Sequence, residues 1–330
     1  MKNLLEKLTQ TTGVSGYENE IREVIRKEIE PFADDIQIDV MGNLIARKGI
    51  KKSGGKRIMI SSHMDEIGLM ASHINDKGFV YVATIGGVNP LTCFSARVKF
   101  LNGTEGVVYA ETQKMDKVPT VDQLFVDVGA DSAETCPVKV GDEAVFVRSF
   151  LDMGNRVVSK AIDDRIGCLV AIETIKALKD SPNELFFVFS TQEEVGLRGA
   201  KTSAFSINPE MGIAVDVTLA ADVPHCEPGN PVLGKGPCIK VRDGSLIAHP
   251  KVIDAMKKAA DRTGIEVQME VLSHAGTDAG AIQLVRSGVP AGCLSIACRY
   301  VHSPSEMVDI NDVSESVRLL VDLLSNPVDL

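Results

Sequence analysis

Histidine and carboxylate residues occur at five places in this sequence where an apolar, strand-like run has just ended. They are His63, the pair Asp163 and Asp164, the pair Glu193 and Glu194, Asp216, and His302. Imidazole nitrogens and carboxylate oxygens are common ligands of divalent metal ions. In an open α/β sheet, ligands bind in the crevice at the carboxyl ends of the strands. The residue types and their positions therefore predict one metal-binding cluster.

Each of these residues, taken alone, has an ordinary structural explanation. A histidine after a strand can be a hydrogen-bonded surface residue, and an Asp–Asp pair before a helix can cap its free amides. The pair Glu193–Glu194 is harder to explain in this way, because it follows the apolar run ELFFVFS, which we expect to be buried. Unpaired charge is costly to bury, so we expect a cation beside these carboxylates.

The charges of such a cluster are balanced by two divalent ions. The carboxylates of Asp163, Glu194 and Asp216 supply three negative charges, a bridging hydroxide supplies a fourth, and the histidines stay neutral. Since five ligands must serve two ions, one carboxylate has to bridge. Two-metal sites of this kind, with ions about 3.5–4 Å apart, hold both oxygens of a displacement reaction. Adjacent Glu side chains point in different directions, so one can bind metal while the other acts as general base.

The elements that position these residues are predicted by hydrophobic periodicity. Residues 1–66 show helical spacing up to about residue 30 and strand-like runs after it. Residues 67–157 alternate short β-type runs with turns, which is typical of a small barrel or sandwich. Residues 158–330 alternate strands and helices, which indicates a mostly parallel sheet covered by helices on both faces. We therefore expect an α/β fold: a discontinuous catalytic domain, 1–66 and 158–330, with 67–157 as an inserted small β-barrel-like domain.

Length and composition describe a globular protein and exclude several partners. The 330 residues are 44% hydrophobic and 24% charged, and the net charge of −10 repels phosphate backbones, so we expect no nucleic-acid partner. No apolar run approaches the roughly 20 residues that span a bilayer, and the first residues do not form a signal-peptide pattern. The seven cysteines contain no Cys-x-x-Cys pair. We expect a cytoplasmic protein that binds no membrane.

Six segments together resemble the tetrahedral (TET) metallo-aminopeptidases, which include glutamyl and deblocking aminopeptidases and members labelled cellulases or endoglucanases. The segments are SSHMDEIG, SKAIDDRIGC, STQEEVGLRGA, AVDVT, HAGTDAGAIQ and RYVHSPSEM. They occur in the order expected for this family, and the resemblance covers essentially the whole chain, including a β-rich dimerisation insertion. The resemblance implies an enzyme that hydrolyses the N-terminal residue from short peptides.

The resemblance also implies roles at individual positions. It implies two divalent ions per chain, Zn²⁺ or Co²⁺, with these ligands: His63 and Asp216 for one ion, Glu194 and His302 for the other, and Asp163 as the bridge. Glu193 matches the general base that acts on a metal-bridging water, and Asp65 matches the carboxylate that orients the first histidine. A cis peptide bond between Asp163 and Asp164 is implied as well. So are dimers built on the β-rich insertion, six of which close into a hollow tetrahedral dodecamer with inward-facing active sites.

Two other functions remain open on the residues alone. A glycoside hydrolase would use a pair of carboxylates across a sugar bond, although the chain has no Trp and only four Tyr to stack sugars. A sugar- or peptide-binding scaffold would use the acidic cluster to hold a structural metal ion. Activity on aminoacyl substrates that is lost with chelation distinguishes the aminopeptidase from both.

Some further residues are assigned to structure rather than chemistry. The stretch Gly229–Lys235 has the spacing of a phosphate-binding loop, but Gly236 takes the place of the required Ser or Thr. His73, His225 and His249 are assigned to the surface or to structure. His274, in the segment SHAGTD, is a candidate for the lining of the substrate pocket.

Overall fold

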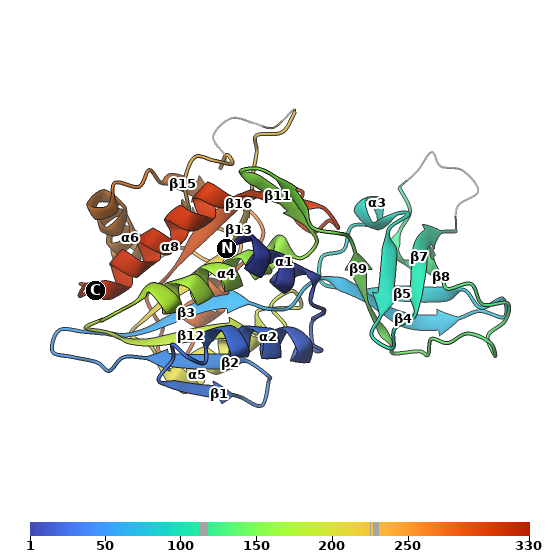
Figure 1. The fold of residues 1–330 in the computed structure, drawn as a ribbon, viewed down its shortest axis with the longest axis horizontal. Helices are drawn as coiled ribbons and strands as arrows, with labels where there is room; N and C mark the ends of the chain where they lie inside the picture. Colours follow the sequence, from blue (N-terminus) through green and yellow to red (C-terminus); the bar gives the residue numbers. More distant parts are fainter. Residues whose placement is uncertain (112–117, 225, 227–230) are drawn as a thin grey trace.

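The protein consists of an α/β body and a smaller β-barrel (Figure 1). The computed structural model describes residues 1–111, 118–224, 226 and 231–330, so His225 and the first two residues of the Gly229–Lys235 pattern lie outside the described residues. Within these ranges, no helix has both the length and the apolar character that crossing a membrane requires.

The sheet of the α/β body has a parallel centre and antiparallel flanks. Its central strands pair in parallel in this order: β12 (Glu184–Ser190), β3 (Arg57–His63), β13 (Met211–Leu219) and β16 (Ala291–Arg299). The flanking strands are β2 (Leu44–Lys48) and β1 (Asp35–Ile38) on one side, and β17 (Glu306–Asp309), β11 (Arg156–Ser159) and β10 (Leu151–Met153) on the other. Strand β14 (Cys238–Arg242) pairs with β16 and with β15 (Gln268–Val271).

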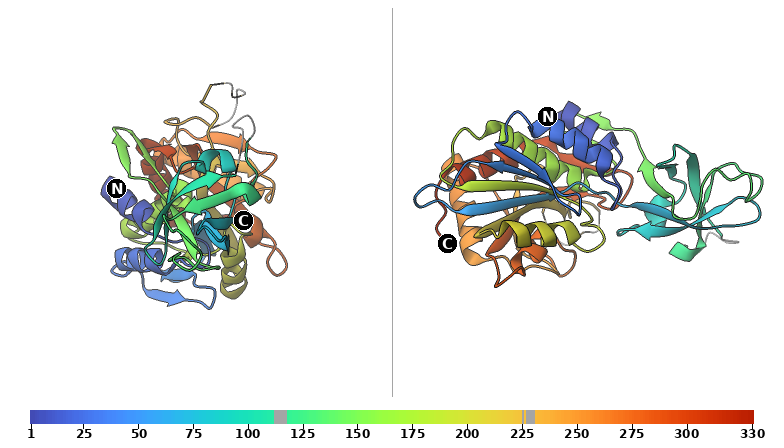
Figure 2. Two further views of the ribbon diagram at one scale, coloured as in Figure 1. Left: turned by 90° about the vertical axis from the view of Figure 1, so that its right-hand side faces the viewer. Right: turned by 90° about the horizontal axis from the view of Figure 1, so that it is seen from below.

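Helices cover both faces of this sheet (Figure 2). One face carries α1 (Lys2–Gln10), α2 (Asn19–Ile29), α4 (Ile162–Ala177), α6 (Pro250–Thr263) and α8 (Ile310–Ser325); the other carries α5 (Arg198–Ile207) and α7 (Asp278–Gln283). The central strands are buried from both sides, which is why they are almost continuously apolar in sequence. The expected α/β fold is confirmed, with parallel pairing concentrated in the middle of the sheet.

The inserted segment forms a closed antiparallel barrel of six strands. They are β4 (Gly68–Ile74), β5 (Val80–Ile85), β6 (Arg97–Phe100), β7 (Glu105–Ala110), β8 (Leu124–Asp127) and β9 (Glu143–Val147), joined in part by α3 (Pro90–Cys93) and the 3₁₀ turn η1 (Val121–Gln123). Side chains that point inward form a hydrophobic core separate from that of the α/β body. The barrel projects from one end of the body (Figure 2). The expected barrel-like insertion is confirmed.

Strand β10 lies inside the expected range 67–157 but pairs outside the barrel. It forms a hairpin with β11, which in turn pairs with β17 at the edge of the larger sheet. Lys2 Nζ also donates to Asp152 Oδ1 at 2.7 Å, which ties β10 to the first helix. A short strand has the same local pattern in either sheet, so only its tertiary partner determines where it belongs.

Candidate metal centre

The parallel strands bring three of the predicted positions to one edge of the sheet. His63 is the last residue of β3 and pairs with Ser190, the last residue of β12. The pair Glu193–Glu194, here called the doublet, comes shortly after Ser190 in the chain, so it emerges beside His63. Asp216 was expected at the end of its strand, but it lies inside β13, because that strand stays paired with β16 as far as Leu219.

Asp163 and His302 reach the same edge from irregular backbone. Asp163 lies in the first turn of α4, where the backbone is not helical, and the Asp163–Asp164 peptide bond is cis, as the resemblance implied. His302 follows β16 in a tight turn in which Tyr300 and His302 both have a φ of 61°.

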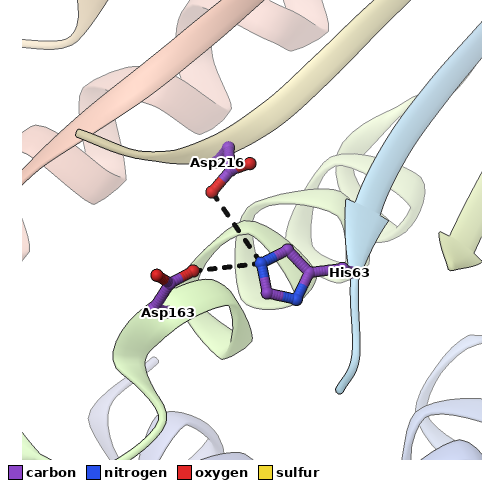
Figure 3. A group of neighbouring side chains, drawn as sticks. All are labelled: His63, Asp163 and Asp216. Atoms are coloured by element: carbon purple, nitrogen blue, oxygen red, sulfur yellow. Dashed lines mark hydrogen bonds and ion pairs between the residues drawn. The ribbon is translucent and has the colours of Figure 1, made fainter. Parts of the chain in front are cut away.

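The Asp163 carboxylate lies between the two histidines. Its Oδ1 is 3.0 Å from His63 Nε2, and its Oδ2 is 3.3 Å from His302 Nε2. On the side of Asp163 that faces His63, called the first side, Asp216 Oδ1 is 4.0 Å from His63 Nε2 (Figure 3). On the second side, Glu194 Oε2 is 3.2 Å from His302 Nε2. In each of these two groups the potential ligand atoms lie within 4.8 Å of one another, and Asp163 is the member that they share.

Asp65 holds the doublet and the first histidine in place. Its carboxylate accepts hydrogen bonds from the backbone N–H groups of Glu193 and Glu194, at 3.0 and 3.2 Å, and from Ser15 Oγ at 2.6 Å. It also lies 3.5 Å from His63 Nδ1, while the backbone oxygen of Asp65 lies 3.1 Å from the same nitrogen. With Nδ1 satisfied in this way, His63 Nε2 is the nitrogen that faces Asp163 and Asp216.

Glu306 performs a similar task on the second side, and sequence reasoning assigned it no role. Its carboxylate accepts from the backbone N–H of Asp163 at 3.0 Å and from that of His302 at 2.8 Å. It thereby joins the start of α4 to the turn after β16. The only sequence signal is its position four residues after His302, within the segment RYVHSPSEM.

The two members of the Asp163–Asp164 pair have different surroundings. Asp164 is fully buried, and its carboxylate accepts from the backbone N–H of His63 at 3.2 Å and of Gly167 at 2.9 Å. The second bond is that of a helix cap, so the ordinary structural explanation of an Asp–Asp pair applies to Asp164. Asp163 is the member that faces the histidines.

Burial and mutual repulsion raise the pKa values of several carboxyl groups in the cluster, whereas hydrogen bonds to His302 and His63 lower that of Asp163. Burial raises the pKa values of Glu193, Glu194 and Asp216, and neighbouring carboxylates raise them further. Burial alone would lower the pKa of His302, but hydrogen bonds to Asp163 and Glu194 raise it to about 12. Divalent cations bind deprotonated ligands, so their binding releases protons from these groups. The cations then balance the negative charge of the carboxylates. The donor set of imidazoles and carboxylates therefore fits divalent ions such as zinc or cobalt.

A cavity of about 490 Å³ opens over this cluster. Its wall includes His274, as expected, and Lys240, together with these apolar residues: Leu197, Val217, Leu219, Leu272, Ala275 and Val301. Neither Phe nor Tyr is found among the described residues that line it. The cavity therefore lacks the aromatic platforms on which a glycoside hydrolase would stack sugar rings.

Glu18 is a buried acid beside the cluster and leads to a stability prediction. Its Oε1 accepts from the backbone N–H of Gly16 at 2.6 Å and of Gln192 at 3.2 Å. Burial, and then repulsion by Asp65, raises its pKa from 4.5 to about 7. The folded protein thus binds this proton more tightly than the unfolded chain does. The stabilisation is complete below pH 4.5 and is lost as the pH rises through about 7.

We expect Glu18→Gln to be more stable than the parent protein at pH 8 and about equally stable at pH 4. The shift corresponds to a difference on the order of 3 kcal/mol in the free energy of unfolding. Unfolding midpoints measured from pH 4 to 8 test this, with the exposed Glu6→Gln as control. A difference between Glu18→Gln and the parent that is the same at every pH would contradict the shift.

Comparison with known proteins shows the family to which this chain belongs. Residues 42–319 match the model of the family described as M42 glutamyl aminopeptidase. The chain is 35% identical to the lysyl aminopeptidase of Pyrococcus furiosus, over 97% of this chain and 96% of that protein.

Two solved structures share the fold. An aminopeptidase of the archaeon Desulfurococcus kamchatkensis is 40% identical, with a TM-score of 0.94 over 98% of this chain and 94% of that one. The Pyrococcus horikoshii TET1 peptidase is 34% identical, with a TM-score of 0.88 over 98% of both chains. The resemblance to the TET aminopeptidases is thus confirmed. The chain belongs to the M42 glutamyl aminopeptidase family and is a hydrolase that acts on peptides.

Proposed function

We propose that this protein is a two-metal aminopeptidase that removes the N-terminal residue from short peptides. The observation that carries the proposal is the position of Asp163 between two groups of potential ligands. His63 and Asp216 would hold one divalent ion, Glu194 and His302 would hold the other, and Asp163 would contribute one oxygen to each. Neither nucleic acid nor membrane has a part in this function.

Glu193 is the proposed general base. Its Oε2 lies 3.9 Å from His63 Nε2, so its carboxylate faces the cluster although it belongs to neither ligand group. Bound divalent ions would lower the pKa of water and polarise the scissile carbonyl. Glu193 would accept the proton that water loses as it attacks, and would then deliver it to the leaving amine. Burial, with repulsion by Asp216 and Glu194, raises the pKa of Glu193, which favours the uptake of a proton by this carboxylate.

Carboxylates beside the metal ligands would also bind the free amine of the substrate. A peptide bound through its terminal amine presents its first carbonyl at the cluster, which restricts hydrolysis to the first residue. The apolar wall of the cavity then surrounds the first side chain.

Hydrolysis of aminoacyl-nitroanilides, with and without a chelator, tests this function. We expect activity that the chelator abolishes and that Zn²⁺ or Co²⁺ restores, and no activity on cellulose derivatives. Activity on cellulose derivatives, or aminopeptidase activity that survives complete metal removal, would contradict the proposal.

We propose that the barrel is the dimerisation domain within residues 67–157, and that residues 1–66 and 158–330 form the catalytic domain. The aromatic side chains of the barrel support this, because five rings, of which four are half-buried and Tyr109 is exposed, form a continuous series of contacts. Adjacent centroids lie 4.5–6.3 Å apart in the order Phe94, Tyr109, Phe125, with Phe79 and Tyr81 both against Phe125. Apolar surface gathered in this way is typical of a protein interface.

The proposed assembly is a tetrahedral dodecamer of six such dimers, with its active sites inside. The P. horikoshii TET1 peptidase can assemble into a tetrahedron or a large octahedral shell. A cytoplasmic location would suit this enzyme, because all seven cysteines are free and five of them are buried, as expected in a reducing compartment.

Tyr109→Glu is expected to weaken the assembly, since it places a charge among the aromatic rings. Tyr109 is 41% exposed in the single chain, so the barrel itself should tolerate the change. Light scattering or native mass spectrometry should show a shift toward monomers. Ile50→Glu, on the α/β body and 66% exposed, is the matched control. An unchanged mass for Tyr109→Glu would place the interface elsewhere.

A further inference from the structure

A turn of the barrel lies against Glu194 and His302, the two residues that belong to the second metal group alone. This turn, residues 86–92, lies between β5 and the end of α3. The backbone oxygen of Gly87 is 3.2 Å from His302 Nδ1, and Thr92 Oγ1 donates to the backbone oxygen of His302 at 3.3 Å. Gly86 lies against the Glu194 side chain, because a Cβ at Gly86 would come within 3.1 Å of Glu194 Oε2.

The close approach at Gly87 requires glycine. A Cβ at this position would lie 2.5 Å from His302 Nδ1 and 2.8 Å from Cε1, well inside van der Waals contact. Gly87 does not have a positive φ, so the strain that a left-handed conformation would impose on alanine does not arise there. An added methyl group would therefore act on the His302 ring rather than through backbone strain.

The two histidines differ in what orients their rings. His63 is oriented by Asp65, two residues away in the same α/β body, and its side chain is only 3% exposed. The His302 side chain is 35% exposed, and its main chain is held from the α/β body by Glu306. Its ring nitrogen Nδ1 is satisfied by Gly87, from the barrel. This bond leaves Nε2 free to face Asp163 and Glu194, which is the arrangement a metal ligand needs.

We propose that the barrel turn 86–92 positions His302 and Glu194, and so sets the affinity of the second metal ion without affecting the first. This inference rests on the proposed two-metal function. Gly87 is a positioning residue, because it acts through His302. The inserted domain would then complete the metal centre in addition to forming an interface.

The test is Gly87→Ala, with Co²⁺ binding measured by equilibrium dialysis and elemental analysis. We expect the first ion to bind as in the parent protein and the second to bind about 10–100-fold more weakly, the usual effect of disturbing a group that orients a ligand. Excess Co²⁺ should restore the second ion and most of the turnover, because Glu193 and the first group are untouched.

Two further variants separate positioning from a general effect on the barrel. Thr92→Val removes the hydroxyl that contacts the backbone oxygen of His302 at 3.3 Å and that of Asn89, within the turn, at 3.0 Å; it should shift the same binding step, by less. Gly129→Ala, in the barrel at a φ of 73° where an added Cβ would meet no atom of the other described residues within 4 Å, should lower barrel stability but leave both binding steps unchanged.

The proposal is overturned if Gly87→Ala and Thr92→Val bind both ions as the parent does. It is also overturned if either variant weakens both ions equally. If the parent protein itself binds fewer than two ions, the two-metal function fails, and this result is distinguishable because it does not depend on any variant.

Discussion

Glu193→Gln is expected to lower turnover by about 10²–10⁴-fold, the range associated with a lost general base. Both metal ions should stay bound, because Glu193 belongs to neither ligand group. Glutamine has almost the same shape but cannot accept the proton from water. The backbone of residue 193, held by Asp65, should not move.

Metal content and steady-state kinetics of Glu193→Gln and Glu194→Gln, measured side by side, test the division of roles in the doublet. Glu194→Gln should lose the second ion as well as activity, since Glu194 Oε2 is 3.2 Å from His302 Nε2. If the two variants lose metal equally, Glu193 is a ligand and its assignment as general base is wrong. If Glu193→Gln keeps both ions and undiminished turnover, the acidic cluster serves structure instead.

Asp163→Asn is expected to weaken both metal ions at once. Asp163 is the shared member of the two groups, with one oxygen facing each histidine. An amide offers only one oxygen and no charge, so it cannot replace a bridging carboxylate. We expect a loss of affinity of at least about 100-fold for each ion, beyond the usual effect of changing an outer group, and activity below detection at equimolar metal.

His302→Ala is the matched comparison for Asp163→Asn. His302 belongs only to the second group, so its removal should release one ion and leave the other in place. Elemental analysis after dialysis against micromolar metal measures both variants. The bridging role of Asp163 is refuted if Asp163→Asn also retains one ion as tightly as the parent.

The local pattern of apolar and polar residues predicted much of this fold, because this pattern reflects directly which faces of a strand are buried. The central strands β3, β12, β13 and β16 are apolar runs since helices cover both their faces. The barrel strands alternate in burial since one face points into a small core. The pairing of β10 was not predictable in this way, because its three exposed residues carry no sign of which sheet receives them.

Residue type and strand-end position identified the chemistry of the site: two histidines and the carboxylates that metal ions prefer. These signals are local, since a pair of carboxylates at the end of a run that is expected to be buried is costly unless a cation pairs with it. The sequence also shows that Glu193 and Glu194, as neighbours, cannot both point the same way. It does not show which one faces which partner.

The resemblance already pointed to Asp65 as the group that orients His63, but only the tertiary structure determined which groups hold His302 in position. Glu306 joins Asp163 to His302 from four residues beyond that histidine, and Gly87 reaches His302 from the barrel. Hydrogen bonds to backbone atoms depend on distance and direction rather than on residue type, so they leave no periodic pattern in a sequence. Gly87 shows this most clearly, because what orients the histidine is a backbone oxygen that every residue carries, and glycine is needed there only for the space it leaves.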